Sequence, residues 1–212
     1  MRDLLIMSIV FAGAFAALKR PWIGVMLWVW LSIMNPHRYA FGFAYNAPVA
    51  AIAFGATIIG LLTTKERSSP FKGTAVTVLA VFMVWISLST LFGIDPGDDY
   101  WQWNKVMKVD VMVLVALMLL HNKKHILALT WMSAGSLAML GAKGGLFTLM
   151  TGGNFRVWGP PGSFIEDNNE FALSLVMAIP LLRFLQLQLT NRWGRHAMSA
   201  TMLMCAVASL GS

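Results

Sequence analysis

The sequence predicts an all-α fold: a polytopic bundle of about eight transmembrane helices, formed by a single membrane domain over residues 1–212. Hydrophobic residues make up 58% of the chain and charged residues 12%, and the mean hydropathy is +0.67. Soluble domains carry about twice that share of charge, and one of this length could not bury so many apolar side chains. A water-soluble class is therefore excluded.

The first four apolar runs are residues 4–18, 22–34, 47–62 and 74–92. The first run contains Ala14-Phe15-Ala16, which is typical of a signal-peptide cleavage site. The basic pair Lys19 and Arg20 follows this run instead of preceding it, so we expect a retained span. Several runs are shorter than the ~20 residues that cross hydrocarbon, so their ends are expected to extend through the interface, and the first two could form a shallow pair.

The last four runs are residues 109–120, 126–142, 171–185 and 197 onward. We expect the fifth helix to begin near Tyr100, because Trp101 and Trp103 suit the membrane interface and Lys105 and Lys108 can snorkel outward. The last run stops without a polar flank. This ending favours a fragment of a longer protein.

Basic residues are concentrated in one of the two sets of loops that alternate along the chain. Glu66 is the only acid in that set, whereas the other set carries more acids than bases. The positive-inside rule then puts the basic set in the cytoplasm and the N-terminus outside. This asymmetry accounts for the net charge of +7 and gives no reason to invoke nucleic acid. The basic set comprises Lys19, Arg20, Lys65, Arg67, Lys72, Lys123, Lys124, Arg183, Arg192 and Arg195.

The richest polar stretch is residues 141–172, GAKGGLFTLMTGGNFRVWGPPGSFIEDNNEFA, which is expected at the outer surface. Its glycines allow tight turns and close approach to a ligand, and Pro160-Pro161 stiffens its middle. We take residues 151–170 as a candidate substrate loop. A plain connector between two spans could have the same composition.

Two cations in this stretch are candidates for binding phosphate. Lys143 lies among glycines at the outer end of the sixth span, where its ammonium could meet a lipid phosphate or snorkel to the interface. Gly141 and Gly145 could instead form a helix-packing face. The Arg156 guanidinium can bind phosphate oxygens in a bidentate way, or pair with an acid such as Glu166.

The run Glu166-Asp167-Asn168-Asn169-Glu170 precedes the seventh span, and part of it is expected to cap that helix. A carboxylate here could also act as a general base or bind a divalent cation. A site for a hard cation needs several converging oxygens, so we expect no metal.

The histidines offer little for catalysis. His121 and His125 have the spacing of helical metal ligands but enclose two lysines, so we expect a solvated turn there. His196 also flanks a basic loop. His37, beside Arg38 in NPHRY, is then the one outward candidate for acid or base work, or an ordinary interfacial histidine. The single cysteine has no partner, and the sequence contains no nucleotide loop or zinc signature, so no cofactor is expected.

Three segments carry a family resemblance: MRDLLIMSIVFAGAFAALKRPWIGVMLWVWLSIMNPHRYAFGFAYNAPVA, KGGLFTLMTGG and RVWGPPGSFIEDNNEFAL. Together they resemble the exosortase-associated O-glycosylation ligases, within the O-antigen ligase and polymerase superfamily. In that superfamily an arginine, a Gly-Phe and an asparagine-rich turn open a transmembrane helix. The matching residues here are Arg156, Gly162, Phe164, Asn168, Asn169 and Ala172.

This resemblance implies a glycosyltransferase of the bacterial inner membrane. Such an enzyme moves a glycan from a polyprenyl diphosphate carrier to a Ser or Thr hydroxyl of a secreted protein on the outer face. On this hypothesis Arg156 and Lys143 contact the diphosphate, because cations there would stabilise the charge that develops on the leaving group. The residues expected to shape the sugar or acceptor pocket are Glu166, Asp167, Asn168 and Asn169.

The family pattern continues beyond Ser212 with a Ser-Arg-Gly stretch and an outer loop whose histidine is proposed as the catalytic base. We therefore expect activity from the complete protein and not from residues 1–212 alone. Other classes stay open: a transporter or flippase for a lipid-linked glycan or anionic solute, a polysaccharide polymerase, and a non-catalytic assembly subunit. Transporters tend to show repeated halves, and the sequence shows none.

Overall fold

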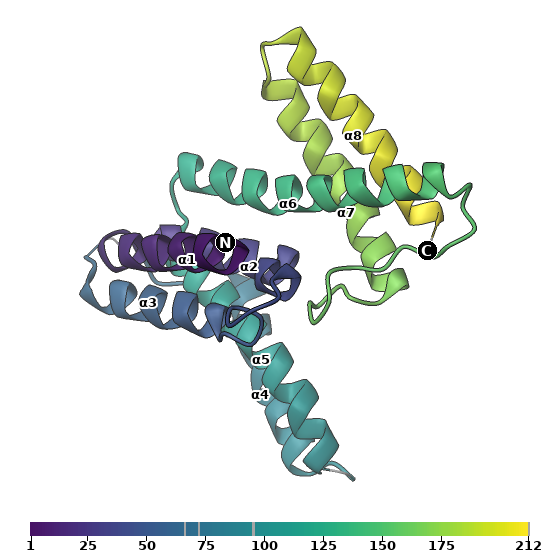
Figure 1. Cartoon of the computed structure of the whole chain (residues 1–212). Coiled ribbons are helices and arrows are strands. Elements are labelled where there is room, and N and C mark those ends of the chain that lie inside the picture. Colours follow the sequence, from purple (N-terminus) through teal and green to yellow (C-terminus); the bar gives the residue numbers. More distant parts are fainter. Residues whose placement is uncertain (66, 72, 95, 212) are drawn as a thin grey trace.

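A computed structural model describes residues 1–65, 67–71, 73–94 and 96–211, and this part of the chain is all-helical (Figure 1). Glu66 and Lys72, which belong to the basic set of loops, lie outside the described residues, as do Asp95 and Ser212. The predicted all-α fold and its eight helical segments are confirmed. The helices are α1 (Arg2–Lys19), α2 (Pro21–Met34), the 3₁₀ helix η1 (Pro36–Tyr39), α3 (Val49–Thr63), α4 (Thr74–Leu91), α5 (Pro96–Leu119), α6 (Lys123–Met150), α7 (Asn168–Gln188) and α8 (Arg192–Leu210).

Three helices in the described part of the chain are long and apolar enough to cross a membrane: α4, α6 and α7. The apolar helices α2 and α3 are shorter. No residue of α4 is buried, and large side chains such as Trp85 and Leu88 are exposed along it. Apolar side chains on all sides are what a helix in contact with lipid presents, so α4 fits the predicted bilayer setting.

The helix α2 is the centre of the N-terminal half, where it packs against α1, α3, α5 and α6. Pro21 occupies the first turn of α2, a position that needs no backbone N–H, so the helix starts directly after α1. Gly24 allows close approach of α3, because a Cβ there would collide with Thr57 Oγ1. At its other end α2 stops at Asn35, whose φ of 45° lies in the left-handed region.

The helices α4 and α5 form a pair that extends away from α1–α3 (Figure 1). The Trp103 indole Nε1 donates a hydrogen bond of 3.0 Å to Ser87 Oγ and ties the two helices together. The early start expected for the fifth helix is confirmed, since α5 begins at Pro96.

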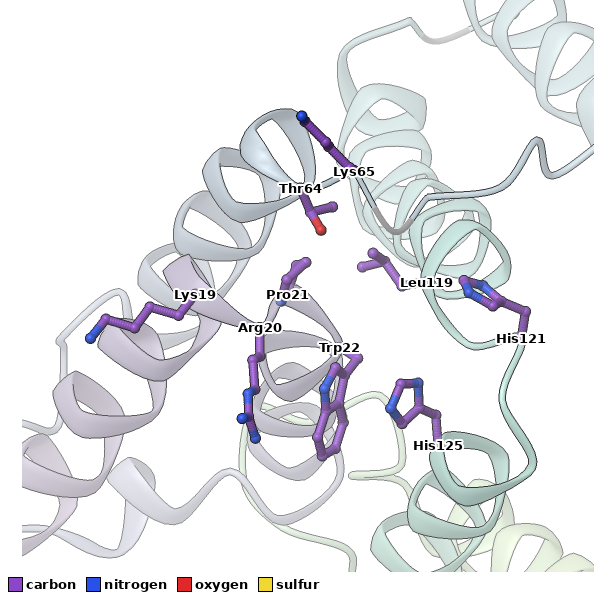
Figure 2. Close-up of a pocket in the computed structure, with 9 residues that line it drawn as sticks. All are labelled: Lys19, Arg20, Pro21, Trp22, Thr64, Lys65, Leu119, His121 and His125. Carbon is purple, nitrogen blue, oxygen red and sulfur yellow. The ribbon is translucent and has the colours of Figure 1, made fainter.

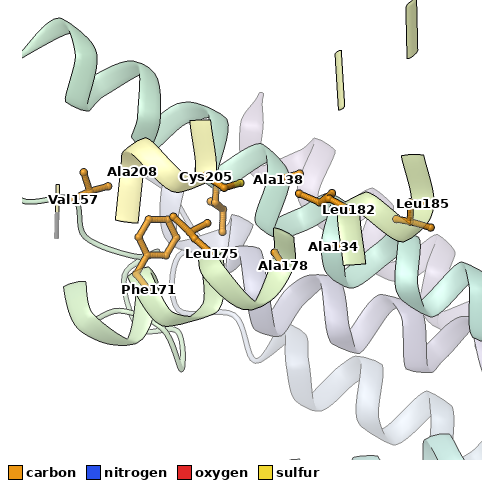
Figure 3. Close-up of a cluster of buried hydrophobic side chains, with 11 residues drawn as sticks. Ala134, Ala138, Val157, Phe171, Leu175, Ala178, Leu182, Leu185, Cys205 and Ala208 are labelled. Atoms are coloured by element: carbon orange, nitrogen blue, oxygen red, sulfur yellow. The ribbon is translucent and has the colours of Figure 1, made fainter. Parts of the chain in front are cut away.

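The C-terminal half is built from α7 and α8, which pack side by side and cross α6 (Figure 1). Their shared core contains Phe171, Leu175, Leu182 and Cys205, all at most 2% exposed (Figure 3). These large apolar side chains fill the space that the small residues of α6 leave open.

Glycines let α6 approach α8 closely. A Cβ at Gly141 would collide with Cys205 Sγ, and one at Gly145 would collide with the Met204 carbonyl oxygen. The helix-packing role of these glycines is confirmed. The sixth apolar run of the sequence ends at residue 142, but α6 continues to Met150 because its glycines pack against a neighbouring helix.

The helices begin and end in two groups, which we call the basic end and the glycine-loop end. At the basic end, α1, α3 and α5 finish and α6 begins. At the glycine-loop end, α2 finishes, α7 begins, and residues 151–167 connect α6 to α7. The prediction of a solvated turn around His121 and His125 is wrong for His125. The centre of its ring lies 4.5 Å from that of Trp22, on which it stacks, and its Nδ1 is buried.

Candidate functional site

The loop of residues 151–167 turns back sharply after α6. Gly152 and Gly153 have φ values of 63° and 77°, a region that side-chain-bearing residues rarely adopt. The Gly153 N–H donates to the Thr148 carbonyl oxygen at 2.9 Å, which satisfies a carbonyl at the end of α6. This double-glycine turn directs the chain so that Arg156 returns toward α6.

A second turn follows at Pro160, Pro161 and Gly162. The φ of Gly162 is 68°, and its N–H donates to Glu166 Oε2 at 2.9 Å. The Gly159 N–H donates to the Glu166 carbonyl oxygen at 3.0 Å. Glu166 therefore closes the loop through both its side chain and its backbone, and it does not form the ion pair with Arg156 that the sequence left open.

The expected cap of α7 is present at Asp167, whose Oδ1 accepts the Asn169 backbone N–H at 2.8 Å. A carboxylate at this position also interacts favourably with the helix dipole. Asn168 is buried and Asn169 is exposed in the first helical turn. Of the four residues expected to shape a sugar or acceptor pocket, Glu166 and Asp167 are thus engaged in holding the loop and the helix.

The turn after α2 docks onto the same loop. Asn35 Nδ2 donates to the Pro161 carbonyl oxygen at 2.8 Å, and a Cβ at Gly162 would lie 3.4 Å from Arg38 Nε. The Arg38 guanidinium itself stacks over the Tyr45 ring at 4.8 Å. The contacts of Asn35 with Pro161 and of Arg38 with Gly162 join residues separated by more than a hundred positions, and they fix the loop against η1.

His37 lies in η1 and is only 8% exposed. Burial, and next the neighbouring charge of Arg38, lower the pKa of His37 below its ordinary value of 6.5, so the ring is neutral at pH 7. Its Nδ1 is buried with no hydrogen-bond partner. His37 lines none of the cavities described below, whereas the adjacent Tyr39 does.

Lys143 and Arg156, the two cations singled out from the sequence, line one cavity of about 240 Å³. They come from different elements, Lys143 from α6 and Arg156 from the loop. The Lys143 ammonium lies 5.0 Å from the centre of the Tyr39 ring. Arg156 is exposed and has no hydrogen-bond or ion-pair partner among the described residues. The other lining residues are Tyr39, Leu140, Gly144, Phe147, Val157, Trp158, Pro160 and Phe171.

The cavity of Lys143 and Arg156 combines positively charged side chains with an apolar lining. Two full positive charges flank it, and aromatic and aliphatic side chains form most of the rest of its lining. A planar guanidinium without a partner can accept two oxygens of a phosphate at once. An amphiphile that carries a phosphate on an apolar chain matches this combination.

A second cationic cavity, of about 310 Å³, lies against the other part of the loop. Lys105 and Lys108 line it, and the Lys105 ammonium lies 5.5 Å from the Phe164 ring centre. Phe164 and Lys108 also border an apolar cavity of about 440 Å³ between α2, α3 and α5. The sequence predicts only that these lysines snorkel outward. The missed signal is the spacing of Trp101, Asn104, Lys105 and Lys108, which places all four on one face of a helix.

A family profile matches residues 1–190. The chain belongs to DUF5935, a family of unknown function. It is also similar to the molybdate-anion transporters of Xenopus laevis and Xenopus tropicalis, with 27% identity over 93 residues in each case. These matches cover 43% of this chain and 20% of each transporter, so the chain spans about a fifth of the length of the curated relatives it matches. No solved structure matches the chain.

The fold of this DUF5935 chain thus brings together the two cations predicted from the sequence, and the other candidate residues hold the loop and its neighbours in place. Lys143 and Arg156 share one cavity. Glu166 and Asp167 bind backbone groups of the loop and of α7, and Arg38 packs against Tyr45. The arrangement can bind an anion at the end of a membrane helix.

Proposed function

We propose that this chain binds the diphosphate of a polyprenyl-linked glycan, as part of a glycosyltransferase that moves the glycan to a Ser or Thr hydroxyl of a secreted protein. The observation that carries the proposal is the cavity shared by Lys143 and Arg156 at the end of α6. The family resemblance of the sequence supplies the reaction class. The geometry supports it because the charge and the apolar wall suit a lipid diphosphate.

In the proposed reaction the acceptor oxygen forms a bond to the anomeric carbon of the glycan. The bond from that carbon to the diphosphate oxygen breaks, its electron pair stays on the diphosphate, and the hydroxyl proton passes to a base supplied by the complete protein. Negative charge therefore grows on the carrier. Fixed cations within reach of that charge stabilise the transition state more than the ground state, which is the role we assign to Arg156 and Lys143.

The surrounding residues have supporting roles in this proposal. Glu166 and Asp167 keep the loop and the start of α7 in position through their backbone hydrogen bonds. Asn169, exposed one position after buried Asn168, is available to a sugar or acceptor hydroxyl. Tyr39 holds the Lys143 ammonium over its ring, which limits the conformations open to the lysine side chain.

We also propose that the glycine-loop end faces the outside of a bacterial inner membrane, with the N-terminus on that side. Lys19, Arg20 and Lys65 lie together at the opposite end of α1–α3, which agrees with a cytoplasmic position under the positive-inside rule. Lipid-linked glycans used for secreted proteins would then meet the loop on the outer face.

The test uses membranes that hold the full-length protein, its lipid-linked glycan and an acceptor protein. Arg156→Ala should abolish transfer of the glycan to the acceptor, because the Lys143 ammonium that also lines the cavity cannot replace the two oxygen contacts of the guanidinium. Arg2→Ala is the matched control, since Arg2 lies at the start of α1 and lines none of the cavities. Transfer that survives in Arg156→Ala membranes at the wild-type rate would remove Arg156 from the reaction.

A second candidate function is transport of an oxyanion, favoured by the similarity to molybdate-anion transporters. The Lys143 and Arg156 cavity could bind a tetrahedral oxyanion as readily as a phosphate. Proteoliposomes containing the full-length protein discriminate the two functions. Uptake of molybdate without any covalent glycan on protein would favour transport. A polymerase would lengthen the glycan on its carrier, and an assembly subunit would do neither.

A further inference from the structure

A cavity of about 570 Å³ lies at the basic end (Figure 2). Its walls come from the junction of α1 and α2, from the residues that follow α3, and from the α5–α6 connection. Its volume falls within the ~300–1,000 Å³ typical of small-molecule sites. The lining residues are Lys19, Arg20, Pro21, Trp22, Thr64, Lys65, Leu119, His121 and His125.

The charge of this cavity is positive. Lys19, Arg20 and Lys65 line it together with two histidines, and no carboxylate among the described residues does. Three helices end here, and each C-terminus contributes about half a negative charge, while the N-termini of α2 and α6 contribute the opposite sign. These partial charges are smaller than the three full positive charges, so the cavity attracts anions.

The inner part of the cavity is organised around an aromatic stack. Figure 2 shows Arg20, Trp22 and His125 in a row, with Lys19 and Lys65 directed outward at the rim. The Trp22 and His125 rings lie 4.5 Å apart at an interplanar angle of 15°. Because Nδ1 of His125 is buried without a partner, Nε2 is the ring nitrogen that a ligand can reach. The site therefore combines a guanidinium, an imidazole and a flat apolar surface.

We infer that this cavity binds a phosphate-bearing ligand. An anionic phospholipid headgroup and a soluble phosphate compound share this phosphate group. A tryptophan beside the ends of apolar helices is typical of the membrane interface. Basic pockets between transmembrane helices on the cytoplasmic side recognise anionic lipid headgroups. The volume leaves room for two phosphates, with Arg20 and His125 contacting the inner one and Lys65 the outer one.

The experiment measures binding of a fluorescent cardiolipin analogue to the detergent-solubilised full chain. Removing two cations in Arg20→Gln/Lys65→Gln should weaken binding about 25-fold, at about fivefold for each charge. Lys65→Gln alone should weaken it about fivefold, and this exposed side chain can be changed without disturbing the helices. Arg192→Gln is the matched control, since Arg192 carries the same charge at the start of α8 and does not line the cavity.

Competition identifies the source of the ligand. Displacement of the analogue by unlabelled cardiolipin but not by sodium pyrophosphate supports a lipid headgroup, and displacement by both supports a site open to soluble phosphate compounds. The proposal is overturned if neither competitor displaces the analogue, or if the double variant weakens binding no more than Arg192→Gln does. Either result leaves the function proposed for the glycine-loop end untouched, because none of these residues lines that cavity.

Discussion

Substitution of Gly145 by alanine tests the packing of α6 against α8, which positions Lys143 in its cavity. The new Cβ would collide with the Met204 carbonyl oxygen and lie 2.9 Å from Met204 Cα. Both atoms belong to the backbone of α8, so no side-chain rotation can relieve the contact and the two helices must separate. Overpacking of this kind costs about 1–3 kcal/mol. We expect Gly145→Ala to lower the free energy of unfolding by that amount.

Gly135 provides a matched control in the same helix. A Cβ at Gly135 meets nothing within 4 Å, so Gly135→Ala should stabilise α6 through the higher helix propensity of alanine, by about 0.5–1 kcal/mol. Unfolding by sodium dodecyl sulphate, followed by circular dichroism, measures both variants. The two shifts should have opposite signs. A Gly145→Ala protein as stable as Gly135→Ala would refute the close contact between α6 and α8.

Two further predictions concern the glycine-loop end. Asp167→Ala should remove the cap of α7 and cost about 1 kcal/mol, seen as faster amide hydrogen exchange in the first turn of α7, whereas Asp167→Asn should keep protection near the wild-type level. The lowered pKa of His37 means that the unfolded chain binds more protons than the folded chain once the pH falls through 6.5, so stability should decrease from pH 8 to pH 5. His37→Gln should flatten that pH dependence, and an unchanged slope would contradict burial of a neutral His37.

Much of the fold could be predicted because apolar runs set helix positions directly. The eight predicted segments match α1–α8 closely, and the early start of α5 followed from its interfacial tryptophans. The extent of α6 could not be predicted, since glycine can either break a helix or pack it against a neighbour. The contact of Gly145 with α8 decides between these, and it depends on tertiary structure.

The candidate site was predictable in its residues but not in its geometry. Lys143 and Arg156 stood out as cations among glycines, yet their shared cavity depends on the left-handed turn at Gly152 and Gly153. The competing local roles of Glu166 and Asp167 follow from hydrogen bonds that residue type alone does not fix. The cavity of Lys105 was missed because the loop residues that complete it meet α5 only in the folded chain, and the cavity of Trp22 was missed because residues from several helices form it.

The most direct test of the central claim is the affinity of polyprenyl diphosphate for the full chain in lipid nanodiscs. A charge-assisted hydrogen bond contributes about 1.5–3 kcal/mol, so Arg156→Gln should weaken binding about 10- to 100-fold, and Lys143→Gln should also weaken it. Lys108→Gln, in the second cationic cavity, should leave the affinity unchanged. Loss of binding in Lys108→Gln, with wild-type affinity in the other two variants, would contradict the account.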